Sequence, residues 1–295
     1  MNNLFKNSYK ILKNNLIFMQ PLLLYILLCQ YATNFLVINK PMQTQRVMIL
    51  VSLFLLTVAF YAGWLYINKL AVVTYNSNDS IEIINKKSIE NLKGFATGVG
   101  KYFLKFLGGF ISVFALTFGS IYGTAKFCIT TFGTPDYFIE WVKTISTANP
   151  NDITYEYIVK TANAMPVEES YIIMAWVSAF FLMFIVLYLI QNIYFSSLVF
   201  EKSNFLVCIF KTIKFFFKNI IGNIVIAIFV LSIFFLFNMF SVLAAMNSIL
   251  FIILFLVFLY FVNYNAIIML KYYYDKTKTD SDSRTECIGE NGSLR

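Results

Sequence analysis

The chain has 295 residues, of which 59% are hydrophobic and 13% are charged, with 33 Phe, 19 Tyr, no His and a net charge of +8. A soluble globular domain is nearer half apolar and one quarter charged, so 23 basic and 15 acidic side chains are too few to cover the surface of a soluble fold of this length. Disorder is excluded because apolar and aromatic residues are abundant. The composition therefore predicts a multi-pass membrane protein.

Six stretches almost free of charge are long enough to cross a bilayer as helices. Crossing about 30 Å of hydrocarbon takes about 20 apolar residues, and these runs are continuous rather than alternating in polarity, which favours helices over a β-barrel. The longest run, 219–270, divides into two spans at a turn between Asn238 and Asn247. The predicted spans are 16–38, 47–68, 104–125, 171–199, 219–240 and 248–270. We therefore predict an all-α fold, a polytopic membrane helix bundle of six transmembrane helices in three hairpins, as one domain over 1–275.

Lysine and arginine are concentrated in alternate connections. The N-terminal segment, the second and fourth connections and the C-terminal tail hold 18 of the 23 basic residues, and the other three connections hold 5. Because basic residues stay on the cytoplasmic side, we predict a cell-membrane protein, in the bacterial cytoplasmic membrane, with both termini cytoplasmic. The net positive charge then reflects topology and anionic headgroups, and we expect no nucleic-acid partner.

Basic, aromatic segments lead into the first, third and fifth spans. They read FKNSYKILKNNLIF, VGKYFLKFLGGFI and FKTIKFFFKNIIGNI. Lysines three to four residues apart share one face of a helix, and such a helix lies in the headgroup layer. We predict lipid headgroup contacts for Lys6, Lys10, Lys13, Lys211, Lys214 and Lys218. The segments indicate either a threefold hairpin repeat or the ordinary basic lead-in of any cytoplasmic span end.

With this basic N-terminal helix, a first span that contains Pro21 and six spans in three hairpins, the chain resembles a loose group of bacterial integral membrane proteins. The group includes the membrane domain fused to some glycerophosphoryl diester phosphodiesterases, and related uncharacterised families. The resemblance covers about residues 4–275 and lies in the order of the elements, without a diagnostic motif. It implies the six-span fold and transfers no functional residue, because the sequence lacks the phosphodiesterase catalytic domain.

The third connection, 126–169, is the largest predicted outer segment. Thr134-Pro135-Asp136 is typical of a helix N-terminus, a short amphipathic helix follows, and Asp152 can cap a second helix. The pair forms either a lid over a cavity among the spans or a helical hairpin on the bilayer surface.

The second connection and the tail are predicted to be cytoplasmic. Asp79 or Ser80 caps a short mixed-charge helix, and the glycines before the third span are expected to loosen the chain there; they are Gly94, Gly98 and Gly100. The tail, 276–295, is polar and charged, and we expect it to be disordered.

No catalytic set is recognisable in the sequence. Without histidine, a Ser-His-Asp triad, a His-ligated metal and an HExxH protease are excluded. The segment GFATGVGKY does not fit a phosphate-binding loop, because Tyr102 stands where Ser or Thr is needed. The four cysteines form no CxxC pair. We expect no enzymatic activity, no metal and no cofactor.

The span interiors carry polar but no charged side chains, so an ion-coupled pump is not indicated. One candidate polar seam is Gln191, Asn192, Asn263 and Asn265. These amides either hydrogen-bond between helices or bind a lipid headgroup or a neutral solute. Gly119 and Gly123 share a face of the third span, and small residues there allow close helix packing, which we expect within the chain rather than between copies.

The sequence favours a non-enzymatic membrane protein that serves as a membrane-embedded partner or lipid-interacting scaffold. Its expected partners are membrane lipids and other membrane proteins. The alternative is a transporter or permease subunit for a neutral or amphiphilic solute. A polar cavity at mid-depth, lined by the four seam residues, would favour transport, whereas dry packing there would favour the scaffold.

Overall fold

The computed structural model describes the chain except for residues 148–164, 245–246 and 293–295. Over the described ranges the regular elements are all helices, and six of them are long and apolar enough to cross a membrane. The span helices are α2 (Met19–Asn39), α3 (Gln43–Thr74), α4 (Ile81–Phe132), α7 (Val167–Phe200), α9 (Ile220–Ala244) and α10 (Ser248–Gly292). The shorter elements are α1 (Asn2–Asn14), the 3-10 turn η1 (Leu16–Phe18), α5 (Asp136–Thr147) and α8 (Phe205–Lys218). The predicted all-α, polytopic fold is confirmed.

Two helices extend well beyond their predicted spans. Helix α4 begins directly after Ser80, whose Oγ accepts a bond from Ile83 N at 3.5 Å, but it continues for 52 residues. At 1.5 Å per residue its axis is about 78 Å long, more than twice the hydrocarbon thickness. Helix α10 likewise continues to Gly292, where we expected disorder from residue 276.

Glycines explain why α4 continues through the segment where we expected it to loosen. An ideal Cβ on Gly98 would meet Cβ of Tyr66 in α3 at 2.6 Å, and one on Gly63 of α3 would meet the Phe95 ring at 2.8 Å. A glycine lowers helix stability by itself, but here it lets an aromatic ring of one helix rest on the backbone of the other. The loosening expected at Gly94, Gly98 and Gly100 was therefore wrong, because all three lie within α4.

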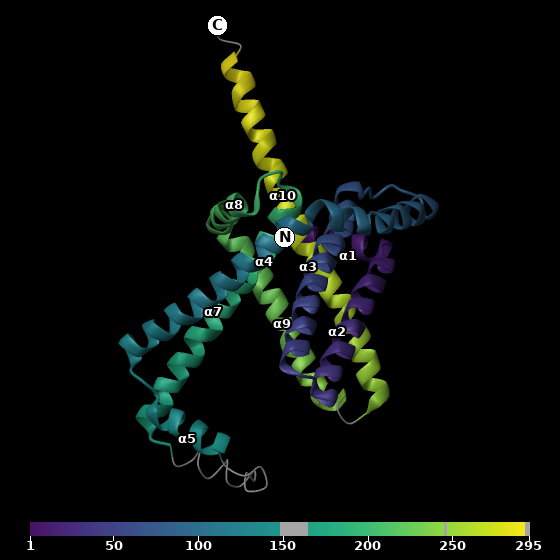
Figure 1. Ribbon diagram of the computed structural model, residues 1–295. Coiled ribbons are helices and arrows are strands. Elements are labelled where there is room, and N and C mark those ends of the chain that lie inside the picture. Colours follow the sequence, from purple (N-terminus) through teal and green to yellow (C-terminus); the bar gives the residue numbers. More distant parts are fainter. Residues whose placement is uncertain (148–164, 245–246, 293–295) are drawn as a thin grey trace. The chain divides into compact units, whose positions relative to one another are not determined.

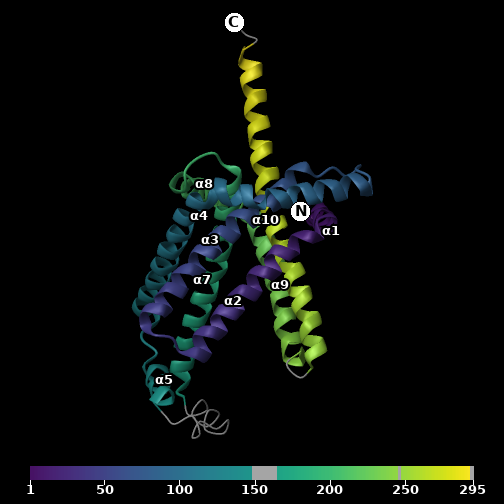
Figure 2. The same ribbon diagram turned by 45° about the vertical axis from the view of Figure 1, so that its right-hand side comes forward.

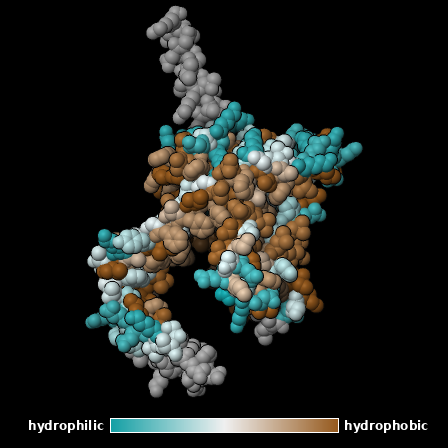
Figure 3. All heavy atoms as spheres, in the orientation of Figure 1, coloured by the Kyte–Doolittle hydropathy of each residue, from teal (hydrophilic) through white to brown (hydrophobic). Residues whose placement is uncertain are grey.

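The chain forms two compact units. Unit 1 comprises residues 1–111 and 189–295, and unit 2 comprises residues 112–188. Within unit 1, α10 contacts α1, α2, α3 and α9. Helices α1 and α8 and the first part of α4 lie at the end of unit 1 opposite the C-terminal end of α9, in both views (Figures 1 and 2). Figure 3 shows an apolar surface along the spans of this unit and a hydrophilic surface at that end.

Unit 2 contains the predicted outer helix. Helix α5 begins at Asp136, as the sequence indicated, but its N-terminus is bonded by a distant carboxylate: Glu169 Oε1 accepts from Tyr137 N at 2.9 Å and from Phe138 N at 3.4 Å. Trp176 Nε1 of α7 also donates to Gly133 O at 3.1 Å. These bonds attach α5 to α7. The second helix predicted after Asp152 lies in the range 148–164, outside the described residues.

Candidate membrane-interface site

The end of α7 is bonded by lysines from two other helices. Lys69 Nζ of α3 lies 2.7 Å from Val199 O, and Lys105 Nζ of α4 lies 2.6 Å from Leu198 O and 2.8 Å from Glu201 O. The last four carbonyls of a helix lack partners within it, and the helix dipole favours cations there. We call Lys69, Lys105 and these three carbonyls the lysine junction. It satisfies the end of α7 and joins three helices.

Aromatic rings position Lys69 within the lysine junction. Its Nζ lies 5.2 Å from the Phe200 ring centroid and 5.8 Å from that of Tyr102, distances at which a cation is attracted to a ring face. The Tyr102 hydroxyl donates to Val199 O at 3.1 Å. Tyr102, the residue that argued against a phosphate-binding loop, thus contacts the same carbonyl as Lys69.

The turn from α7 to α8 is held at several points. Asn204 caps α8, with Oδ1 accepting from Val207 N at 3.0 Å, as is usual for an N-cap. The Glu201 carboxylate pairs with Lys211 of α8 and accepts a bond from the Tyr273 hydroxyl of α10 at 2.9 Å. This carboxylate therefore ties the first half of α8 to α10.

Helix α8 has three faces. One is buried against the protein and contains Cys208, Thr212, Phe215 and Phe216. A second is exposed and apolar, with Phe210 74% and Phe217 68% exposed; this α8 apolar stripe is Leu206, Phe210, Ile213 and Phe217. Their spacing of four, three and four residues places them on one side of the helix. The third face is exposed and basic and contains Lys211, Lys214 and Lys218.

Helix α1 has only two faces. Its buried face contains Leu4, Ser8, Ile11 and Leu12, and it packs against α10. The Tyr264 hydroxyl of α10 donates to Phe5 O at 3.0 Å, and the Phe5 ring lies 4.6 Å from that of Phe229 in α9. The predicted amphipathic helix is present, but protein rather than lipid covers its apolar face.

The six lysines predicted to contact headgroups are all exposed. They differ in their protein partners. Lys211 is paired with Glu201, which weakens its assignment to a headgroup. Within the described part of the chain, four have neither a hydrogen bond nor an ion pair: Lys6, Lys10, Lys13 and Lys214.

The predicted polar seam involves two helices. Gln191 and Asn192 are half-buried in α7, whereas Asn263 is fully buried and Asn265 half-buried in α10. Neither amide atom of Asn263 has a hydrogen-bond partner among the residues that the structure describes. Such an orphaned amide lowers stability unless water satisfies it.

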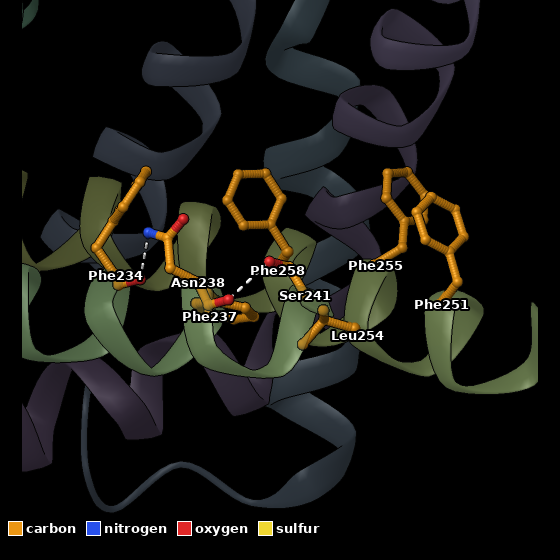
Figure 4. A pocket seen from close by; sticks show the side chains of 8 residues that line it. All are labelled: Phe234, Phe237, Asn238, Ser241, Phe251, Leu254, Phe255 and Phe258. Atoms are coloured by element: carbon orange, nitrogen blue, oxygen red, sulfur yellow. Dashed lines mark hydrogen bonds between the residues drawn. The ribbon is translucent and has the colours of Figure 1, made fainter. Parts of the chain in front are cut away.

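An apolar groove of about 220 Å³ lies between the C-terminal part of α9 and the N-terminal part of α10 (Figure 4). It contains none of the four seam residues; it is lined by Phe234, Phe237, Asn238, Ser241, Phe251, Leu254, Phe255 and Phe258. The two polar side chains bond carbonyls of their own helix, Asn238 to Phe234 O at 3.0 Å and Ser241 to Asn238 O at 2.7 Å. The groove therefore presents mainly aromatic surface.

No atom of the described residues lies within 4 Å of an ideal Cβ at Gly119 or Gly123, so the helix packing expected at this pair stays a prediction. A close contact occurs earlier in the same helix, where a Cβ on Gly108 would meet the Phe205 ring at 2.7 Å. This glycine lets α4 approach the start of α8.

Among the described residues, no group of three or more Cys, Asp or Glu is placed to hold a metal ion. Comparison of the chain with family models, with curated proteins and with solved structures finds no match. The resemblance to the membrane domain of some phosphodiesterases therefore stays a prediction, and the function must be argued from the residues above.

Proposed function

We propose that this multi-pass membrane protein is a non-enzymatic, lipid-interacting scaffold whose α1 and α8 end faces the cytoplasm. The observation that carries the proposal is that both helices present exposed lysines at one end of unit 1. Four of these lysines have no protein partner in the described chain. Lysines near a membrane surface attract anionic phospholipids, by about 1 kcal/mol each.

The polar contacts at this end support a scaffold because they join helix to helix. Lys69 and Lys105 bond the carbonyls that end α7, and Glu201 bonds α8 and α10. Such contacts hold α8 against the other helices, and its basic face remains exposed.

A transporter or permease subunit is the second candidate, and one observation favours it. Buried polar atoms without a partner within the described residues occur on four helices of unit 1, at Ser8, Trp64, Asn68, Asn223 and Asn263. A hydrated path would supply the missing partners. Against it, the groove between α9 and α10 is apolar.

Lipid retention tests the scaffold proposal. The full chain, extracted in mild detergent, is expected to retain anionic phospholipids, measured by native mass spectrometry. Changing Lys6, Lys10, Lys13 and Lys214 to Gln should reduce the retained anionic lipid several-fold. The matched control changes the same number of charges in the connections predicted to lie on the outer side, at Lys40, Arg46, Lys126 and Lys143. Equal retention in both variants contradicts the proposal.

Labelling tests the predicted orientation. In intact cells, a membrane-impermeant maleimide should react with the Glu140→Cys variant. It should react with the Lys10→Cys variant only after lysis. The opposite pattern overturns the orientation.

A further inference from the structure

We infer that α8 lies in the membrane surface, with the α8 apolar stripe inserted into the acyl layer of the leaflet whose anionic headgroups contact Lys214, and that α1 does not insert. The headgroup contact rests on the proposed lipid-interacting function, whereas the depth of the stripe does not.

The first step concerns the length of α8. Its 14 residues give a helix about 21 Å long, which is too short to cross about 30 Å of hydrocarbon. The helix is nonetheless apolar on two of its three faces, and protein covers only one of them. The four side chains of the α8 apolar stripe remain exposed, between 41% and 74%. A helix with these properties lies at the interface.

The second step concerns the connections of α8. Four residues separate the end of α7 at Phe200 from the start of α8, and α9 begins at Ile220, directly after Asn219. Both neighbours are candidate spans. Such short connections attach both ends of α8 to spans. The helix therefore lies only a few residues from the bilayer. Lipid is therefore the favoured occupant of the stripe, ahead of a soluble protein.

The third step concerns rotation about the helix axis. The Glu201 pair holds the first half of α8. At its other end, the Tyr272 hydroxyl donates to Asn219 O at 3.2 Å, and the rings of Phe215 and Tyr273 lie 4.9 Å apart. These contacts fix which face meets the protein. The direction of the stripe relative to the spans is therefore set by the fold.

The charge pattern agrees with this placement. The basic face adjoins the stripe, so a stripe in the acyl layer brings its lysines to the level of phosphates, where long side chains extend toward the headgroups. Helix α1 lacks a second apolar face, since its apolar residues Leu4, Ile11 and Leu12 are buried and the helix packs against α10. Helix α1 therefore serves as the comparison for α8 in the test of membrane insertion.

Spin-label accessibility tests the inference. In a chain whose four cysteines are changed to Ala, single labelled cysteines replace Phe210, Lys214 and Lys10. In vesicles of phosphatidylethanolamine and phosphatidylglycerol, the label at 210 should collide several-fold more with oxygen than with a water-soluble nickel chelate. Labels at 214 and 10 should show the reverse. Nickel access at 210 equal to that at 214 overturns the inference.

Two further measurements separate the possible failures. In purely zwitterionic vesicles, a label at 210 that stays in the acyl layer supports the insertion of the stripe even if the lipid-retention experiment fails. A second variant, Phe210→Gln with Phe217→Gln, keeps the six spans and should increase nickel access at a labelled residue 213, whereas Tyr9→Gln on α1 should leave it unchanged. No change from the double variant contradicts the inference.

Discussion

Lys105 of α4 bonds the end of a helix 93 residues further along the chain: its Nζ lies 2.6 Å from Leu198 O. A second carbonyl, that of Glu201, lies 2.8 Å from the same nitrogen. One ammonium group thus bonds the last turn of α7 and the turn that leads into α8. The position of α8 depends on this contact between α4 and α7.

Replacement of Lys105 by Met should therefore destabilise unit 1. The substitution keeps most of the side-chain volume but leaves two carbonyls without their donor, at a cost of about 1–3 kcal/mol. Thermal unfolding in detergent should show a lower midpoint. Lys93→Met, on an exposed site of the same helix, should shift the midpoint little, because surface substitutions usually stay within about 0.5 kcal/mol. Equal midpoints for the two variants would show that the lysine junction contributes no stability.

The same substitution at two glycines of α4 should change the stability of the protein in opposite directions. Gly98→Ala places a Cβ 2.6 Å from Cβ of Tyr66, whereas a Cβ on Gly100 meets no atom of the described residues within 4 Å. The first should destabilise the contact between α3 and α4 by about 1–3 kcal/mol, as overpacking does. Gly100→Ala should stabilise the protein by about 0.5–1 kcal/mol, because Ala is more favourable than Gly inside a helix. The denaturation midpoints of both variants test this prediction. A higher midpoint for Gly98→Ala would contradict the close packing.

Much of the fold could be predicted from the sequence because a span is defined by local composition. The charge-free runs predicted six span helices. The observed bounds agree with the predicted ones to within a few residues at most ends, as in α7 and α9. The continuation of α4 was missed because glycine usually interrupts a helix. Only the distant Tyr66 ring shows that Gly98 is a packing site.

The candidate site was harder to predict because its partners are distant in sequence. Lys69 and Lys105 were counted as charges that set the topology, and no local pattern relates them to carbonyls 130 and 93 residues away. The α8 apolar stripe was visible as Phe210 and Phe217 in the basic lead-in. Separating it from the buried face required the contacts with α10, which only the structure gives.

Substitution of the buried amide Asn263 distinguishes a dry core from a hydrated path. Asn263→Leu removes two polar atoms that have no partner in the described structure, and Leu has a similar size, so a dry core should gain about 1–3 kcal/mol from losing the unsatisfied groups. The melting midpoint should rise. Asn238→Leu, on an exposed part of α9, is the comparison and should change it little. A lower melting midpoint for Asn263→Leu would favour water or a solute at this position and thus the transporter.

Removal of the Glu169 carboxylate should release the start of α5. Its Oε1 accepts bonds from Tyr137 N and Phe138 N, two of the donors that a helix N-terminus leaves unpaired, and a carboxylate there also interacts favourably with the helix dipole. Glu169→Ala should cost about 0.5–2 kcal/mol of local stability, as lost caps do. Amide hydrogen exchange across residues 136–147 should then speed up several-fold. Glu168→Ala changes the neighbouring, exposed carboxylate and should leave that exchange unchanged, so equal rates in both variants would contradict the cap.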